Sequence, residues 1–79
     1  MPKLRQLSGS DVVKILESFG FLVAAQKGSH IKLTRQALTD KEVLTIPNHK
    51  TLKTGTTKAI YNQAAKYIAA EELRKVFYR

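Results

Sequence analysis

The sequence predicts an α+β fold in which two helices pack on a three-stranded antiparallel sheet, in the order αβββα. Three observations carry this prediction: a helical stripe of apolar residues near the N-terminus, three short strand-like segments in the middle, and a second helical stripe after residue 53. At 79 residues the chain is short for one domain. We therefore expect residues 1–79 to form a single domain with one modest core.

The first helix is expected from about Gly9 to Phe19. Ser8 and Asp11 form an S-x-x-D capping pattern, in which a side-chain oxygen accepts a hydrogen bond from a free backbone N–H group. The apolar residues that follow recur at i, i+3, i+4 and i+7, which is the spacing of one helical face. Gly20 then provides a residue that can adopt the left-handed conformation that ends many helices.

A β-hairpin and a third strand are predicted next. Residues 21–26 are largely apolar, the Lys27-Gly28 pair signals a tight turn, and residues 29–34 alternate between polar and apolar side chains. Residues 42–46 form the third strand, which stops at Pro47 because proline cannot donate a hydrogen bond to a central ladder. The three strands should form a meander.

The alternation in the second strand predicts which of its side chains are displayed. Ile31 and Leu33 share one face, which we expect to be buried. The period of two then places His30, Lys32 and Thr34 on the opposite face, so that His30 is displayed and not buried.

Thr54 is expected to cap the second helix. The inward stripe of this helix has the spacing i, i+4, i+7 and i+8, at Ile60, Ala64, Tyr67 and Ile68. The helical spacing continues in the tail, residues 70–79. This tail is either an extension of the second helix or a separate short helix, and the spacing leaves both open.

The net charge of +8 is concentrated in the middle of the chain. Residues 27–58 hold seven of the fourteen Lys and Arg but two of the six Asp and Glu. A positive field attracts phosphate backbones, acidic proteins or anionic lipid, although a small basic surface can also serve solubility alone. The chain has no cysteine, and its longest apolar run, residues 19–25, is far too short to span a membrane. We expect a soluble cytoplasmic protein with no membrane partner.

Gly28-Ser29-His30 is the most specific candidate site. A glycine turn lets a phosphate group approach backbone N–H groups, and an outward imidazole beside it can accept or donate a proton near neutral pH. Hydrolysis of RNA needs such a group, because a base must remove the proton of the 2′-hydroxyl. The alternative is a surface histidine that happens to follow an ordinary hairpin glycine.

His49, in the polar loop Pro47-Asn48-His49-Lys50, is the candidate second proton-transfer group. It could complete an acid and base pair with His30 across the end of the sheet, although most loop histidines are simply solvated. Two histidines without cysteine do not supply the three or four ligands of a zinc site, and Asp40 and Glu42 are interpreted as solvated turn charges. We expect no metal and no cofactor.

Several of these segments together resemble the HicA family of bacterial toxins. The motifs occur in family order over roughly residues 7–73: Phe19-Gly20-Phe21, Lys27-Gly28-Ser29-His30, Thr45-Ile46-Pro47-Asn48-His49, Leu52-Lys53-Thr54-Gly55-Thr56 and Ala59-Ile60-Tyr61-Asn62-Gln63-Ala64. The resemblance implies a fold like that of double-stranded-RNA-binding domains, an mRNA interferase activity, a HicB-like antitoxin that covers the toxin, and a catalytic role for His30. One departure is the absence of the family's glycine near the end of the second helix, where this chain has residues 65–68 of sequence Ala-Lys-Tyr-Ile.

The sequence therefore predicts a toxin that is a metal-independent endoribonuclease acting on mRNA, with His30 as the general base or acid. The residues expected to hold RNA are Lys27, Gly28, Ser29, Lys32, Lys50, Lys53 and Lys58. The alternative is a non-catalytic RNA-binding module with the same fold and charge. A third interpretation is a protein-interaction domain whose basic face binds an acidic partner.

Overall fold

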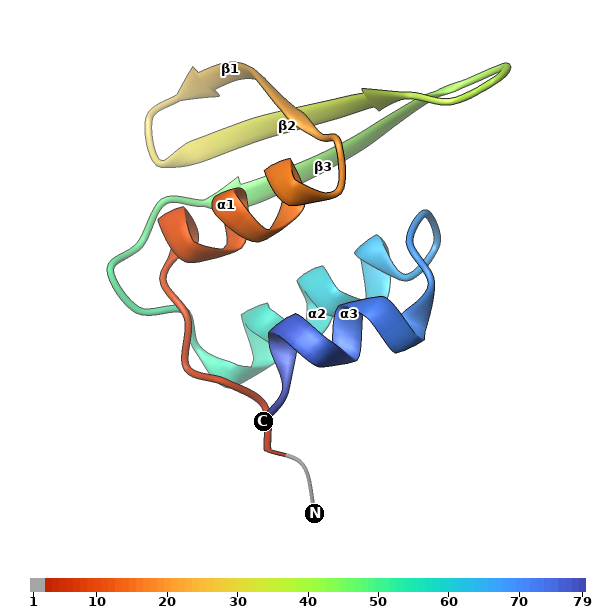
Figure 1. Cartoon of the computed structure of the whole chain (residues 1–79). Helices are drawn as coiled ribbons and strands as arrows, with labels where there is room; N and C mark the ends of the chain where they lie inside the picture. The colour runs from red at the N-terminus through yellow and green to blue at the C-terminus, as the bar shows by residue number, and fades with distance from the viewer. Residues whose placement is uncertain (1–2) are drawn as a thin grey trace.

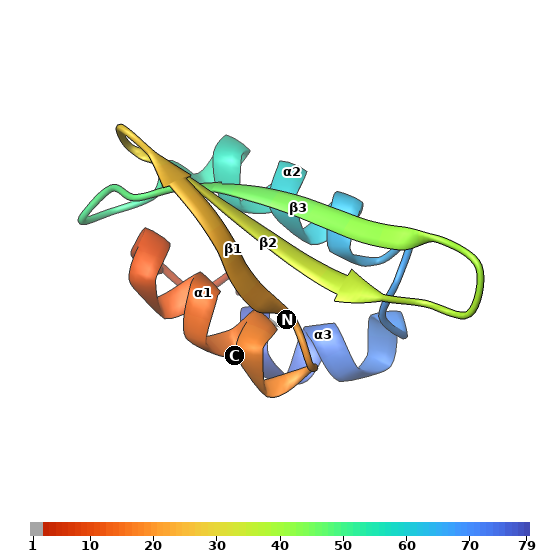
Figure 2. The ribbon, with the colours of Figure 1, turned by 90° about the horizontal axis from the view of Figure 1, so that it is seen from above.

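The structure is a computed structural model that describes residues 3–79. Its elements are α1 (Gly9–Ser18), β1 (Leu22–Lys27), β2 (His30–Gln36), β3 (Lys41–Pro47), α2 (Thr54–Ala64) and α3 (Ala70–Phe77). The strands form one antiparallel sheet in the order β1-β2-β3, and the helices lie below it in Figure 1. In Figure 2, which looks down on the sheet from above, no element of residues 3–79 covers the upper face. The predicted α+β class and αβββα order are confirmed, and the tail forms a separate third helix.

α1 begins and ends as its sequence predicts. The Ser8 hydroxyl accepts a hydrogen bond from the Asp11 backbone N–H at 3.0 Å, and the Asp11 carboxylate accepts one from the Ser8 N–H at 3.0 Å. This reciprocal pair satisfies two N–H groups that a bare helix end would leave free. At the other end Gly20 has a φ of +94°, in the left-handed region that glycine adopts without strain.

The β1–β2 hairpin closes through a two-residue turn at Gly28 and Ser29. Lys27 pairs with His30, and Gly28 at the first central position has a φ of +60°, as a type II′ turn requires. Beyond the turn β2 alternates as predicted. Ile31 and Leu33 are buried against the helices, whereas His30 and Lys32 are exposed on the upper face.

β1 is an edge strand whose residues are all exposed. Leu22 is 70% exposed and Val23 is 48% exposed. The residue of this segment that is buried in the core is Phe21, which lies directly before the strand. The register with β2 shifts between Val23 and Ala25, which is a β-bulge of one extra residue.

The core lies between the lower face of the sheet and the three helices. Its fully buried side chains come from every layer: Val12, Leu16, Phe21, Leu33, Ile46, Ala64, Leu73 and Phe77. α3 contributes two of these residues, so it is part of the core and not an appendage. Within residues 3–79 none of the helices has the length and apolarity that crossing a membrane requires.

The expected cap of α2 is wrong by one residue. Lys53 occupies the cap position with extended backbone, and Thr54 is already helical and makes no capping hydrogen bond. The reason is a contact distant in sequence: the buried Leu52 donates its backbone N–H to the Leu7 carbonyl at 2.8 Å. This bond anchors the chain at residue 52, and the helix begins directly after Lys53.

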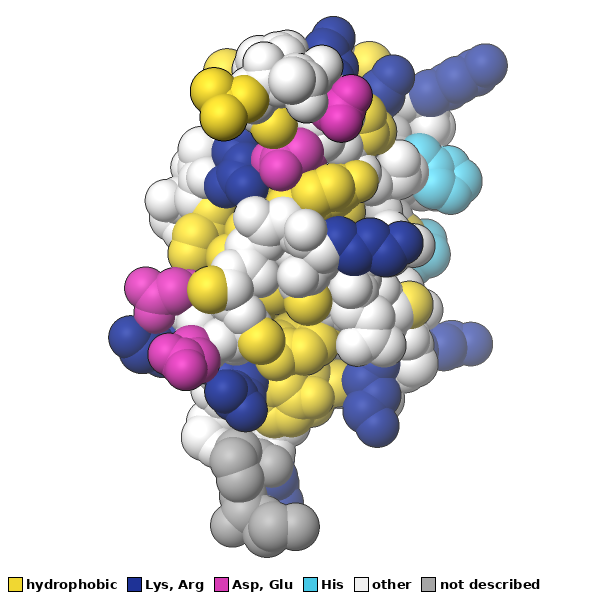
Figure 3. Space-filling model, turned by 90° about the vertical axis from the view of Figure 1, so that its right-hand side faces the viewer, with side chains coloured by type: hydrophobic (Ala, Val, Ile, Leu, Met, Phe, Trp, Pro, Cys, Tyr) yellow, Lys and Arg dark blue, Asp and Glu magenta, His cyan; other side chains and the backbone are white. Residues whose placement is uncertain are grey.

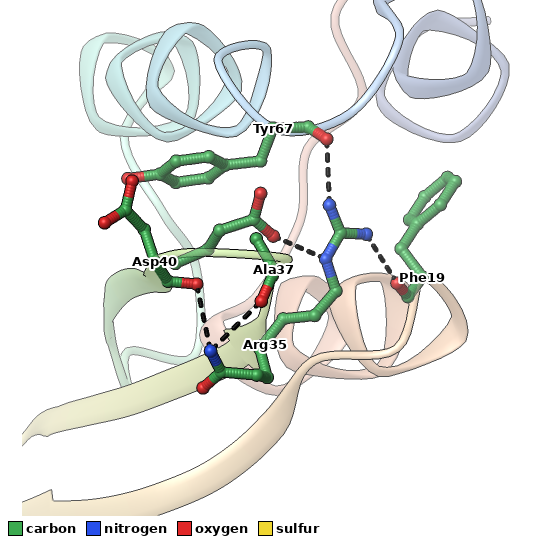
Figure 4. A network of polar contacts seen from close by, with 7 residues as sticks. Phe19, Arg35, Ala37, Asp40 and Tyr67 are labelled. Carbon is green, nitrogen blue, oxygen red and sulfur yellow. Dashed lines mark hydrogen bonds and ion pairs between the residues drawn. The ribbon is translucent and has the colours of Figure 1, made fainter.

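A long-range contact from Arg35 accompanies the end of α2, which the sequence left open. Although residues 65–69 contain no glycine, α2 stops at Ala64 and no non-glycine residue among the described ones has a positive φ. The guanidinium of Arg35 donates to the Tyr67 carbonyl at 2.8 Å and to the Phe19 carbonyl at 2.8 Å (Figure 4). Its Nε donates to the Glu42 carboxylate at 2.6 Å, so the interpretation of Glu42 as a solvated turn charge is wrong: this residue lies in β3 and its side chain is 14% exposed. We call Arg35 and these three acceptors the arginine clamp.

Candidate functional site

The two histidine-bearing segments meet at one end of the sheet. The backbone N–H of Asn48 donates to the Ser29 carbonyl at 2.6 Å, and Pro47 lies opposite His30 in the β2–β3 register. The β1–β2 turn and the loop after β3 are therefore direct neighbours. We call residues 27–30 and 47–50 together the histidine end. Figure 3 shows the two histidines of the chain, in cyan, at the same edge of the molecule.

Both imidazoles of the histidine end are exposed, as are the turn residues beside them. A Cβ built at Gly28 would meet no atom within 4 Å, so the outer side of the turn is open space. A phosphate group can thus approach the backbone of the turn while the side chain of His30 stands next to it. Among residues 3–79 no three His, Cys, Asp or Glu side chains come together in a group that could hold a metal ion.

Backbone contacts with the start of α1 hold the loop that carries His49. The Gly9 N–H donates to the His49 carbonyl at 2.8 Å. Gly9 is buried, and a Cβ at this position would lie 2.2 Å from the Pro47 carbonyl oxygen and 2.9 Å from the Asn48 Cα. The helix and the loop approach each other so closely that only glycine fits between them.

Gly9 is a site-supporting residue that the sequence analysis missed. Its one signal was a glycine in the first turn of a helix, where glycine is tolerated but gives no stability. Asn48 was noted only as a member of its loop, and its backbone bond to Ser29 was not foreseen. Both depend on which segments the fold brings together, and a local pattern does not encode this.

The lysines expected to hold RNA are all exposed, and they lie in the sheet, in the loop before α2 and in α2 itself. Lys27 and Lys32 project from the upper face of the sheet, Lys50 and Lys53 lie in the loop before α2, and Lys58 lies in its second turn. In Figure 3 a series of Lys and Arg side chains follows the edge that carries the histidines. The site is therefore an open basic surface.

Comparison with known proteins adds one finding. The model of a family described as the HicA toxin of bacterial toxin-antitoxin systems matches residues 9–65. This span covers more than half of the chain, contains both histidines, and ends one residue after α2. No curated protein and no solved structure gives a significant match.

Proposed function

Since the chain belongs to the HicA toxin family, and is thus the toxin of a toxin–antitoxin system with an antitoxin partner, we propose that it is a metal-independent endoribonuclease acting on mRNA. The observation that carries this proposal is the exposed His30 beside an open glycine turn, with Lys27 and Lys32 on the same face of the sheet. A titratable imidazole among phosphate-binding groups suits proton transfer during cleavage of RNA.

The proposed reaction uses the two histidines in turn. His30 takes the proton of the 2′-hydroxyl, and the 2′-oxygen attacks the neighbouring phosphorus. The bond from phosphorus to the 5′-oxygen breaks, and His49 supplies the proton that this leaving oxygen needs. The products are a 2′,3′-cyclic phosphate and a free 5′-hydroxyl. The shared position of His30 and His49 at the histidine end supports their proposed use as a proton-transfer pair.

The remaining groups of the site bind charge. The Gly28-Ser29 backbone faces the phosphate and neutralises part of the negative charge that develops on it. The lysines position the RNA backbone without reading its sequence: Lys27, Lys32, Lys50, Lys53 and Lys58. We further propose that the fold is related to double-stranded-RNA-binding domains, that the toxin acts in the cytoplasm, and that a HicB-like antitoxin inhibits it by covering the His30 face.

The deciding experiment is digestion of a long RNA by the purified protein in EDTA. The wild-type protein should cut the RNA and leave cyclic phosphate ends, and His30→Ala should lower the rate by about 100-fold or more. Gln36→Ala is the matched control, because Gln36 is an exposed residue at the other end of the same strand. It should cut RNA at the wild-type rate.

Two other outcomes would separate the alternatives. If the wild-type protein cuts only after magnesium is added, the reaction needs a metal and the proposed chemistry is wrong. If the protein binds RNA in a salt-dependent way but never cuts it, the chain is a non-catalytic RNA-binding module.

A further inference from the structure

Two exposed aliphatic side chains lie in one row across the upper face of the sheet, which no element of residues 3–79 covers (Figure 2). Leu22 pairs with Thr34 across β1 and β2, and Thr34 pairs with Val43 across β2 and β3. The three side chains therefore form one line across the sheet, which we call the apolar row. Leu22 is 70% exposed and Val43 is 38% exposed.

The apolar row is separate from the histidine end but lies on the same face. The next row along the strands consists of Ala25, Lys32 and Thr45, and the row after that consists of Lys27, His30 and Pro47. Each step of two residues is about 7 Å along a strand, so the apolar row lies about 13 Å from the row of His30. A protein that binds to the apolar row is therefore large enough to cover the row of His30 as well.

The charge around the apolar row is entirely positive among the described residues of the upper face. Lys27, Lys32 and Lys41 project from it, and the acidic residue of β3, Glu42, points to the lower face, where it is paired with Arg35. The upper face thus combines exposed aliphatic side chains with unopposed cations.

We propose that the apolar row is the docking surface for a protein partner, the antitoxin of the same system, which packs an apolar side chain on Leu22 and Val43 and sets carboxylates against Lys32 and Lys41. Charge complementarity selects an acidic partner. The apolar row gives RNA little to bind, because bases stack on aromatic side chains and Leu22, Thr34 and Val43 include none. The existence of an antitoxin follows from family membership, and only the consequence that docking blocks cleavage rests on the proposed function.

The test measures the affinity of the purified cognate antitoxin for toxin variants. Leu22→Thr and Val43→Thr remove the apolar contacts but keep side chains that suit strands. Leu38→Thr is the matched control, because Leu38 is 104% exposed and lies in the β2–β3 hairpin, away from the row. The double variant Leu22→Thr/Val43→Thr should bind the antitoxin at least about 10-fold more weakly, and Leu38→Thr should bind as the wild type does. Thermal melting of each variant verifies that it is folded.

Lys41→Glu probes the polar part of the surface. It should weaken antitoxin binding most at low salt, because reversing a charge removes an attraction that salt otherwise screens. Wild-type affinity of the double variant, or an equal loss for Leu38→Thr, would overturn the proposal. A loss of RNA affinity in the double variant, with antitoxin affinity retained, would mean that RNA occupies the row. If the wild-type protein cuts no RNA, the proposed function fails, yet the antitoxin affinities still decide the docking surface.

Discussion

The two ends of β2 are held in opposite ways. At one end, the segments around His30 and His49 are tied by backbone bonds, Asn48 N–H to the Ser29 carbonyl and Gly9 N–H to the His49 carbonyl, and their side chains are exposed. At the other end, about 17 Å away along the strand, the arginine clamp uses a partly buried side chain to tie three segments.

This difference shows how a small domain can keep a surface available for chemistry. Where main-chain groups and a close glycine contact fix the geometry, the side chains stay free to bind a ligand. Where a side chain joins the end of α1, the sheet and the α2–α3 turn, its guanidinium is already held by three acceptors of the protein, so it is not free to move toward a ligand. The comparison predicts that a substitution in the arginine clamp lowers stability, whereas a substitution of an exposed side chain at the histidine end lowers activity.

The largest effect on stability is expected for Arg35→Ala. The substitution removes the donors to the Phe19 and Tyr67 carbonyls and leaves the Glu42 carboxylate, which is 14% exposed, without its partner. We expect a loss of about 3 kcal/mol in the free energy of unfolding, which corresponds to a melting temperature lower by on the order of 10–20 °C.

His30→Ala is the matched variant at the other end of the strand. Because its side chain is exposed, the free energy of unfolding should change by less than about 0.5 kcal/mol, while RNA cleavage is lost. Calorimetry of both variants tests the comparison. A His30→Ala protein that melts as low as Arg35→Ala would show that the histidine end is also held by its side chains.

Gly9→Ala should have the next largest effect. The added Cβ would lie 2.2 Å from the Pro47 carbonyl oxygen, so the loop that carries His49 must move. We expect a loss of about 1–3 kcal/mol in stability and a fall in kcat of about 10-fold or more, because a displacement near 1 Å disturbs catalytic geometry.

Gly55→Ala is the control for Gly9→Ala. Gly55 also lies in the first turn of a helix, but a Cβ there meets no atom within 4 Å. It should leave kcat unchanged and raise stability by about 0.4–1 kcal/mol. Equal kinetics for the two alanine variants would show that the close approach at Gly9 does not position the loop.

The variants Lys32→Ala and Lys41→Ala show how much a positive charge at each end of the upper face contributes to RNA binding. Lys32 lies one row from His30, and Lys41 pairs with Gln36 near the arginine clamp. With an uncleavable RNA in the His30→Ala background, Lys32→Ala should lower the slope of log affinity against log salt by roughly one unit or less. Lys41→Ala should lower it less. The reverse order would place the RNA at the wrong end of the sheet for the proposed reaction.

The smallest effect concerns acid stability at the start of α1. Hydrogen bonds from the Ser8 backbone N–H and hydroxyl hold the pKa of Asp11 below its usual value. A carboxylate with a lowered pKa in the folded state contributes stability above its unfolded pKa and loses it as the pH falls through the folded one. Melting curves of the wild type and Asp11→Asn should therefore differ at about pH 6 and converge below about pH 3. If the difference in melting temperature between the two proteins stayed constant over this pH range, the ionised Asp11 carboxylate would contribute nothing to stability.

Local chemistry made much of the fold predictable. The capping residues of α1, its terminal Gly20 and the alternation of β2 each depend on residues within a few positions of one another, and the structure confirms all three. The exposed face of His30 follows from that alternation alone. The neighbouring position of His49 was a hypothesis that needed the sheet topology, which brings the loop after β3 beside the β1–β2 turn.

The missed features share a dependence on contacts that are distant in sequence. The start of α2 is displaced because Leu52 is bonded to Leu7, and the end of α2 is accompanied by a bond from Arg35, 32 positions before Tyr67. The requirement for Gly9 comes from a loop about 40 residues later. Periodicity and capping patterns carry no information on such pairs. The chemical roles of the lysines and histidines remain predictions for the experiments above.

The bulge in β1 has a consequence for the protein before it meets any partner. A regular edge strand with exposed Leu22 and Val23 would offer an unpaired row of N–H and C=O groups to the same strand of another copy, which is how edge-to-edge aggregation begins. The register shift between Val23 and Ala25 breaks the regular spacing of those groups. The net charge of +8 adds repulsion between copies. β1 thus displays apolar side chains without giving other copies a regular template along its own free edge.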